Sequence, residues 1–303
     1  PGGIDYPEPL WSTLHMIIPQ TPLMIILAIV VAPFFGALLS GIDRRLTARA
    51  QGRMGPPILQ PIHDTIKLLR KEPILLNWMQ IVYAYLHLLF MVMAFLLLVL
   101  GKDSLMFLFV FAFSTLSLVL GGMCVRSPYS RIGSQREIML MVAYEPILIL
   151  LMIGFYLANN ESFQLSAPML AAKPMIISLP LLFLAFLVVL AIKLHKSPFD
   201  IATSHHAHQE LVKGITIEYS GPHLAILEIA HFYEMALLFF FIVLFWSSPV
   251  WIGIILASLS FFLMTVVDNA FARLTTMWVF KFMWTGALIL AVTNVFWLYW
   301  ASK

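Results

Sequence analysis

Residues 224–246 of this chain read LAILEIAHFYEMALLFFFIVLFW. Glu228, His231 and Glu234 are the strongly polar residues in an otherwise apolar stretch. A helix rises about 1.5 Å per residue and needs about 20 mainly apolar residues to cross the hydrocarbon core of a bilayer. The stretch therefore predicts a transmembrane helix that carries ionisable side chains at membrane depth.

Similar apolar stretches recur along the whole chain. Composition agrees, because 61% of the residues are hydrophobic and 11% are charged, whereas soluble proteins carry about 25% charged residues. A soluble enzyme is therefore excluded, and we expect an all-α integral membrane protein with residues 1–303 in a single membrane domain. About eight transmembrane helices are predicted, at 22–41, 81–100, 104–124, 138–158, 175–195, 224–246, 249–267 and 283–300.

Redox and nucleic-acid chemistry find little support in the residues themselves. Cys124 is the only cysteine, and one thiol cannot hold an iron–sulfur cluster or build a thiolate metal site, which need several ligands. The formal net charge is only +3, with no basic tail for nucleic acid. We expect no cofactor and no metal in this chain, and any redox centre in another protein.

Lys and Arg are distributed very unevenly between the two predicted sides. If both termini lie outside, only Lys102, Lys173 and Lys303 are on the outer side. The other cations fall at inner ends and loops: Arg44, Arg45, Arg49, Arg53, Lys67, Arg70, Lys71, Arg126, Arg131, Arg136, Lys193, Lys196, Lys213, Arg273 and Lys281. Because cytoplasmic loops collect positive charge, we expect the long connections at 42–80, 196–223 and 268–282 to be cytoplasmic.

The first inner segment predicts an amphipathic helix on the cytoplasmic membrane surface. Pro61 suits a first helical turn, and Ile62, Ile66 and Leu69 then share one face. Attachment to lipid headgroups is one interpretation. The other is docking of a soluble partner, which the Gly-Pro-Pro turn at 55–57 favours. The candidate docking residues are Arg44, Arg45, Arg49, Arg53, Asp64, Lys67, Arg70 and Lys71.

Ionisable residues within two predicted spans form the second constellation. Glu137 and Glu145 belong to the fourth span, and Glu228, His231 and Glu234 form a ladder spaced by three residues in the sixth. A charge at the centre of a membrane helix costs about 3 kcal/mol or more, so these groups should face a wet or protein-lined interior. Burial favours the neutral forms of both types, which suits proton transfer. A polar cluster that only joins helices is the alternative.

The inner loop before the sixth span adds more titratable groups, namely Asp200, His205, His206, His208, Glu210 and Glu218. Together with the ladder they predict a route from the cytoplasmic face into the membrane. The histidine run could bind a metal, but no second ligand group has a recognisable zinc spacing. Proton relay or hydrogen bonding within the loop is the favoured interpretation.

Four ordered motifs give the chain a family resemblance. They are the run GRMGPPILQPIHDTIKLLRKE at 52–72, PFD at 198–200, QELVKG at 209–214 and EYSG at 218–221. Together they resemble the complex I subunit 1 family. That family includes the membrane subunit that shapes the quinone chamber of respiratory complex I, and its counterparts in energy-converting [NiFe] hydrogenases.

Departures from the quinone-reducing pattern point to one branch. The glycine–proline turn at 55–57 leads almost directly into Ile58-Leu-Gln-Pro61, which shortens the quinone-side loop, and the segment at 201–209 is longer and rich in histidine. The fourth span opens with SQREIML and continues to YEP at 144–146. These features are most similar to the membrane subunit of Ech-type hydrogenases (Ech, Coo and formate hydrogenlyase).

The resemblance implies a membrane subunit without catalytic residues of its own in an oxidoreductase complex of a bacterial or archaeal cytoplasmic membrane. It would couple ferredoxin-linked hydrogen evolution or uptake to translocation of protons or sodium ions. Implied partners are a nickel–iron large subunit, an iron–sulfur small subunit, an antiporter-like membrane subunit and membrane lipid. By motif position, Asp200, Glu210 and Glu218 match the family's acidic loop, and Glu137 its acid in the fourth span.

Two alternatives remain open at the level of sequence. The chain could form the quinone chamber of a complex I-type oxidoreductase, against which the shortened loop argues. It could also be a self-contained ion transporter that uses the ladder of Glu228, His231 and Glu234. Such a transporter would need no partner, whereas the cytoplasmic loops are long and rich in motifs.

Overall fold

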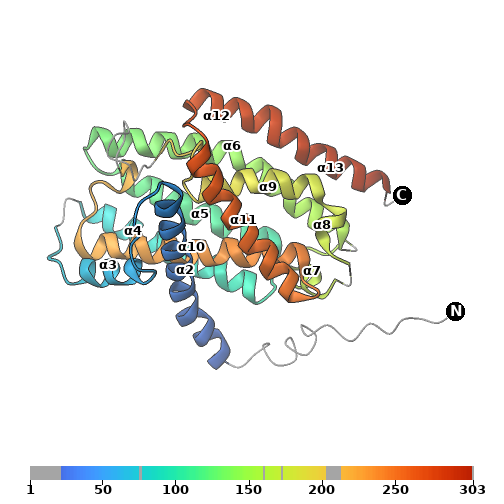
Figure 1. Ribbon diagram of the computed structural model, residues 1–303, viewed down its shortest axis with the longest axis horizontal. Helices are drawn as coiled ribbons and strands as arrows, with labels where there is room; N and C mark the ends of the chain where they lie inside the picture. Colours follow the sequence, from blue (N-terminus) through green and yellow to red (C-terminus); the bar gives the residue numbers. More distant parts are fainter. Residues whose placement is uncertain (1–21, 75–76, 160, 172, 203–212, 302–303) are drawn as a thin grey trace.

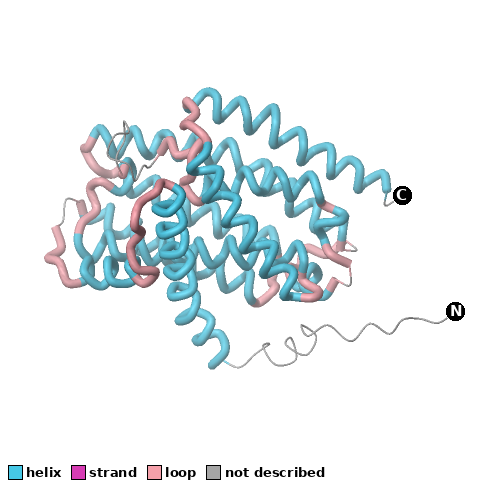
Figure 2. Tube along the Cα trace, in the orientation of Figure 1, coloured by secondary structure: helices cyan, strands magenta, loops and turns pink. Residues whose placement is uncertain are grey.

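Helices make up most of the chain, as Figure 2 shows. The computed structural model describes residues 22–74, 77–159, 161–171, 173–202 and 213–301. Within these ranges there is no β-sheet, only an isolated bridge between Asp103 and Gln164. The predicted all-α fold is therefore confirmed.

Seven helical segments among the described residues are long and apolar enough to span a membrane. They are α2 (Pro22–Ala50), α4 (Trp78–Val99), α5 (Ser104–Met123), α6 (Pro128–Ala158), α10 (Gly221–Val243) with the 3-10 turn η2 (Leu244–Trp246), α11 (Val250–Ala270), and α12 (Thr276–Phe282) continued through the π-turn η3 (Met283–Ala287) into α13 (Leu288–Ala301). Apolar side chains such as Phe34, Phe109 and Phe296 are exposed on their outer faces. Such faces suit contact with lipid.

The fifth predicted span, at 175–195, forms a shorter helix than expected and is not among these seven. It divides into α8 (Met175–Ser178) and α9 (Pro180–Lys193). The break falls at Leu179, because the residue before a proline is disfavoured in the helical conformation and Pro180 has no N–H to continue the helix. Pro180 instead stands in the first turn of α9, where no intrahelical donor is needed.

Helices α2 and α6, in contrast, are longer than predicted. Helix α2 continues nine residues further than predicted, to Ala50, since no proline intervenes after Ser40 and the next glycine with a positive φ is Gly52 (φ 68°). The basic residues at 44–49 are therefore helical and not in a loop. Helix α6 begins at Pro128, ten residues before the predicted span, and the predicted loop at 268–282 shrinks to the residues between α11 and α12.

Helix α10 runs through the middle of the bundle (Figure 1). Helix α2 crosses it steeply, while α6, α9 and α13 lie together along one side. The short helix α3 (Gln60–Leu69) lies at one end of the molecule, and α7 (Ser166–Leu170), α8 and the C-terminus lie at the other. The described residues thus have one end rich in basic residues and loops, and one end with short connections.

Helix α3 is the predicted amphipathic helix. Its Pro61 and Thr65 are buried against the bundle, where α3 packs on α10 and α2. Ile66 and Leu69 are exposed. Ile62, the third residue of the predicted apolar face, is half-buried. Most of that face is therefore turned outward, as a helix on a membrane surface requires.

Close helix packing depends on small residues and on aromatic rings. A methyl group added to Gly36 of α2 would lie 1.8 Å from the carbonyl oxygen of Phe232 in α10, so only glycine permits this crossing. Deeper in the core, the ring of Phe241 lies 5.1 Å from that of Phe186 and 5.8 Å from that of Phe155. These contacts join α10 to α9 and α6 and hold α10 at the centre.

The start of α9 is capped from another helix. Asn294 of α13 is fully buried, and its Oδ1 accepts hydrogen bonds from the backbone N–H groups of Leu181 and Leu182, both at 2.9 Å. Its Nδ2 donates to the carbonyl of Ser178 at 3.1 Å. The first N–H groups of a helix have no partner within the helix, so this side chain satisfies them inside the bundle.

Candidate functional site

The ladder on α10 reaches from a half-buried position into the core. Glu228 and His231 are half-buried and Glu234 is buried. His231 Nδ1 lies 3.7 Å from Glu234 Oε2. The three side chains line a common cavity, so the shared face expected from their three-residue spacing is present.

Lys193, at the end of α9, is the cation that meets this ladder. Its Nζ lies 3.3 Å from Glu234 Oε1 and donates to Thr115 Oγ1 at 2.8 Å. The same atom lies 4.3 Å from the ring centre of Phe111 and 4.9 Å from that of Tyr144. The residue is 4% exposed. The sequence analysis counted Lys193 only among the cations at the inner ends and loops. Its position as a single lysine at the end of a long apolar run was the signal that could have indicated a buried partner.

Of the two acids of α6, Glu137 lines the same cavity as the ladder, whereas Glu145 does not. Glu137 is 4% exposed, and its Oε2 has no hydrogen-bond partner among the described residues. Glu145 is half-buried, and its Oε1 is likewise without a hydrogen bond there. A buried carboxylate oxygen without a partner is costly, so water or a neutral, protonated carboxyl group suits both positions.

His87 of α4 is a further buried histidine that sequence reasoning missed. Its Nδ1 is 2.9 Å from both the carbonyl oxygen and Oγ of Ser114. A carbonyl can only accept, and the Ser114 hydroxyl donates to the His87 carbonyl at 2.9 Å. Nδ1 therefore carries the proton, which leaves Nε2 as an acceptor on a side chain that lines the cavity.

The ladder cavity has a volume of about 370 Å³. Glu228, His231 and Glu234 of α10 line it together with Glu137 and His87. It is also lined from α2, from α3 and the residues after it, and from the segment before α10, by Arg44, Asp64, Lys67, Lys71 and Lys213. An opening thus connects the basic end of the molecule with buried acids.

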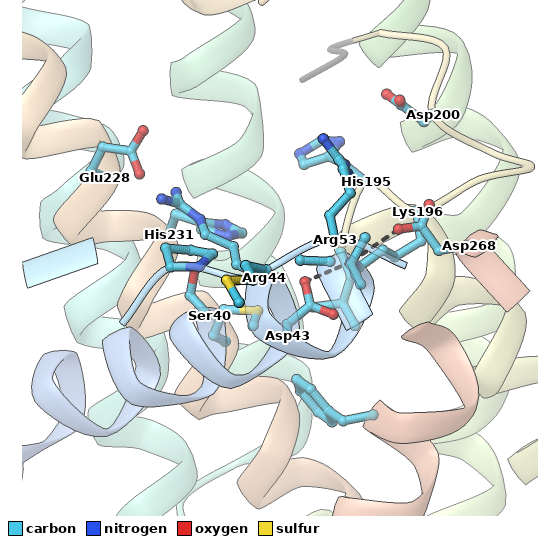
Figure 3. A pocket seen from close by; sticks show the side chains of 17 residues that line it. Ser40, Asp43, Arg44, Arg53, His195, Lys196, Asp200, Glu228, His231 and Asp268 are labelled. Atoms are coloured by element: carbon cyan, nitrogen blue, oxygen red, sulfur yellow. Dashed lines mark hydrogen bonds and ion pairs between the residues drawn. The ribbon is translucent and has the colours of Figure 1, made fainter. Parts of the chain in front are cut away.

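A second cavity, of about 500 Å³, lies beside the first. Figure 3 shows Glu228, His231 and Arg44 on one side of it, with Lys196 and Asp268 opposite. His195 lines both cavities, as do Arg44, Glu228 and His231. The two cavities therefore meet at these four ionisable side chains.

Lys196 joins three elements at the wall of the second cavity. Its Nζ lies 2.6 Å from Asp43 Oδ2 of α2 and 3.2 Å from Asp268 Oδ2 of α11. Asp268 also accepts from the backbone N–H of Ser197 at 2.9 Å, and Asp43 from Thr265 Oγ1 at 2.8 Å. Burial by itself lowers the pKa of Lys196, but the two carboxylates outweigh it and hold the pKa above its ordinary value. The charged Lys196 thus connects α2 and α11 to the segment after α9. We call its ion pairs with Asp43 and Asp268 the clamp.

The predicted docking residues divide into two groups. Arg44 pairs with Asp64 at 3.3 Å, and Asp64 also accepts from Gln60 Nε2 at 2.8 Å, so this pair fastens α2 to α3. The remaining residues are exposed cations: Arg45, Arg49, Arg53, Lys67, Arg70 and Lys71. They give the α3 end of the protein a positive surface.

The acidic loop is only partly described. Asp200 is 4% exposed and lines the second cavity, and Glu218 is half-buried just before α10. His205, His206, His208 and Glu210 lie outside the described residues. Within the described ranges, no three His, Cys, Asp or Glu side chains gather in a way that could hold a metal ion.

Proteins of similar sequence include a component of a hydrogenase and subunits of a formate hydrogenlyase and of an NADH-quinone oxidoreductase. Hydrogenase-4 component C of Escherichia coli is 28% identical over 86% of this chain and 91% of its own length. Formate hydrogenlyase subunit 4 of the same organism is 31% identical over 63% of this chain and 66% of its own length. A subunit of the NADH-quinone oxidoreductase of Anoxybacillus flavithermus is 28% identical over 84% of this chain and 85% of its own length.

A solved structure shares the fold. A chain of the membrane-bound sulfane sulfur reductase, an archaeal respiratory membrane complex, superposes with a TM-score of 0.82 at 25% identity, covering 90% of this chain and 98% of that one. The family described as NADH dehydrogenase matches residues 23–299. The chain therefore belongs to the NADH dehydrogenase family, the family of complex I subunit 1.

Proposed function

We propose that this chain is the membrane subunit of an energy-converting [NiFe] hydrogenase that couples ferredoxin-linked hydrogen evolution or uptake to translocation of protons or sodium ions. The nickel–iron centre and the iron–sulfur clusters belong to partner subunits, and this chain carries none of them. Its similarity to hydrogenase-4 component C and formate hydrogenlyase subunit 4 supports the proposal. Its place in a family of respiratory-complex subunits agrees with a role as one part of an oxidoreductase.

The single observation that carries the proposal is the pair of cavities that meet at His195, Glu228 and His231. A change of charge in a partner docked at the basic end acts on ionisable groups along these cavities, where screening by water is reduced. The groups respond by taking up or releasing protons. The proposed coupling residues are Glu137, Glu145, Asp200, His205, His206, His208, Glu210, Glu218, Glu228, His231 and Glu234.

The partners attach at different places in this proposal. The exposed cations of α2, of α3 and of the residues that follow each of them bind the soluble catalytic and iron–sulfur subunits on the cytoplasmic side, and both termini face outward. Beyond Lys193 the core is apolar, lined by Phe111, Phe186 and Phe241. Ions therefore do not cross through this part of the chain, and an antiporter-like membrane subunit provides their path. This argues against a self-contained transporter.

The first experiment identifies the complex. The chain is tagged near Lys303, gently solubilised from its membrane and analysed for co-purifying subunits, nickel and iron. Activity is then measured with reduced ferredoxin and with a quinone. Nickel together with ferredoxin-dependent hydrogen evolution supports the proposal. Quinone reduction without nickel refutes it in favour of a complex I-type enzyme, and a solitary active polypeptide refutes it in favour of a transporter.

A second experiment tests the coupling residues in vesicles that contain the assembled complex. Glu228→Gln keeps the shape of the side chain but removes its charge and its proton, so ion transport should fall while the subunits still co-purify. Glu161→Gln, an exposed position in the loop after α6, is the matched control and should leave transport unchanged. Normal transport by the Glu228→Gln complex would reject the role of the ladder.

The quinone chamber is the second candidate function. The supporting observation is that the NADH-quinone oxidoreductase relative from Anoxybacillus flavithermus matches this chain at 28% identity, the same level as hydrogenase-4 component C. However, a quinone ring and its isoprenoid tail require a mainly apolar pocket, whereas ionisable side chains such as Asp200, Glu228 and Lys196 line the larger cavity. The hydrogenase proposal therefore has the better fit.

A further inference from the structure

Lys193 marks the boundary between the polar cavity and the apolar core. On one side its ammonium group contacts Glu234, which lines the ladder cavity. On the other side it borders a void of about 10 Å³ whose lining is otherwise apolar and includes Phe111 and Phe186. Lys193 itself is 4% exposed. Its charge therefore depends on the few polar groups within reach.

Two carboxyl groups compete for this single ammonium group. Glu234 Oε1 lies 3.3 Å from Lys193 Nζ. Glu137 also interacts electrostatically with Lys193, but it forms no ion pair among the described residues, and its buried Oε2 accepts no hydrogen bond there. Two buried carboxylates with one cation would leave one negative charge unpaired, which is strongly disfavoured.

This inference rests on the proposed function, in which protons move along these groups. We infer that Lys193 is a positioning residue that allows only one of Glu137 and Glu234 to be charged at a time, and that its movement from Glu234 to Glu137 transfers one proton between them. Lysine has a flexible four-carbon stem that permits such a movement.

The step conserves charge and protons. In the arrangement described, Glu234 is a carboxylate beside the ammonium group and Glu137 is a neutral acid. When the ammonium group moves to Glu137, the O–H bond of Glu137 breaks and an O–H bond forms on Glu234, and the proton crosses the cavity that both groups line. Lys193 keeps its own protons throughout.

The groups around the pair determine which arrangement is favoured. His231 of α10 lies 3.7 Å from Glu234, and a positive charge on it stabilises the Glu234 carboxylate. His87 of α4 lines the cavity between α10 and α6, while Thr115 of α5 and Tyr144 of α6 hold the ammonium group. Because His231 borders both cavities, charge changes there bias the position of Lys193.

Infrared spectroscopy of the solubilised native complex tests the inference, because a protonated buried carboxyl group has its own C=O band. Glu137→Gln should remove one such band and so assign it. The decisive variant is Glu234→Gln, which leaves Glu137 intact but frees Lys193 to pair with it. The Glu137 band should then be lost as well. Spectra of the native complex and of all variants are recorded at the same pH, so that differences between them do not arise from a change of pH.

Lys193→Met and Lys193→Arg supply the reciprocal test. Without the cation both carboxyl groups should be protonated, so Lys193→Met should gain a second carboxyl band and lose ion transport. Lys193→Arg retains the charge and should keep a single band. Lys102→Met, an exposed position at the opposite end of the bundle, should leave the spectrum unchanged.

The outcomes separate this inference from the proposed function. A Glu137 band that persists in Glu234→Gln, or a spectrum of Lys193→Met identical to that of the native complex, overturns the shared-cation arrangement while ion transport by the native complex still supports the function. If the bands change as expected but the native complex transports no ion, the proposed function fails and the sharing of Lys193 stands.

Discussion

Replacing Lys196 with methionine should destabilise the protein by about 3 kcal/mol. Coulomb's law with an effective dielectric constant of about 20 gives about 6 kcal/mol for a 2.6 Å contact and about 5 kcal/mol for a 3.2 Å contact. Desolvation of the three groups offsets most of this attraction. Removal of one partner of a buried pair costs about 3–5 kcal/mol, and the side chains here are 12–21% exposed, which favours the lower end.

The assay is equilibrium unfolding in detergent micelles, followed by tryptophan fluorescence. Lys173→Met, an exposed lysine in the connection before α8, is the control and should change the free energy of unfolding by less than about 0.5 kcal/mol. Asp268→Asn should cost less in the Lys196→Met background than in the native protein, because it then relieves repulsion with Asp43. A loss below about 0.5 kcal/mol for Lys196→Met, or additive effects of the two changes, would refute the clamp.

The clamp also predicts a pH dependence. The folded-state pKa of Lys196 is raised. The contribution of Lys196 to the free energy of unfolding is therefore complete below the unfolded-state pKa of lysine, about 10.4. It is lost only as the pH rises through the folded-state pKa. The difference in stability between the native protein and Lys196→Met should therefore be constant from neutral pH to about pH 10 and shrink above it. A difference that already shrinks between pH 7 and 9 would contradict this sign.

Three further predictions concern packing, capping and docking. Gly36→Ala should destabilise the bundle by about 1–3 kcal/mol, since its methyl group would overlap backbone atoms of α10, whereas Gly286→Ala, with only van der Waals contacts, should be neutral or slightly stabilising in the same unfolding assay. Asn294→Leu should cost about 1–3 kcal/mol, because it leaves buried N–H groups at the start of α9 without partners; an unchanged unfolding midpoint would show that the cap is unimportant. Reversing the charge of Arg70 and Lys71 should release the soluble subunits from the purified complex at lower salt than in the native complex, as judged by co-purification, and equal salt resistance would remove the exposed cations from the interface.

Much of the fold follows from the sequence because hydrophobic length is a local property. Any helix that crosses a bilayer needs about 20 apolar residues, so the spans, α3 and the ladder spacing on α10 were all predictable. The ends of the helices were less predictable. Arg44 and Arg49 were predicted to lie in a loop because they are charged, whereas α2 continues through both of them. Charge indicates where a membrane ends, whereas helix propensity and proline or glycine decide where a helix ends.

The sequence by itself determined the residue types of the candidate site and the family, because both can be recognised in short continuous stretches of residues. Tertiary structure alone decided which groups meet. Lys193 and Glu234 are far apart in the chain, and no local pattern indicates that they form an ion pair or that Glu137 forms none with any residue that the structure describes. The physical reason is that the cost of a buried charge depends on partners brought by other helices, and only the packed bundle fixes those partners.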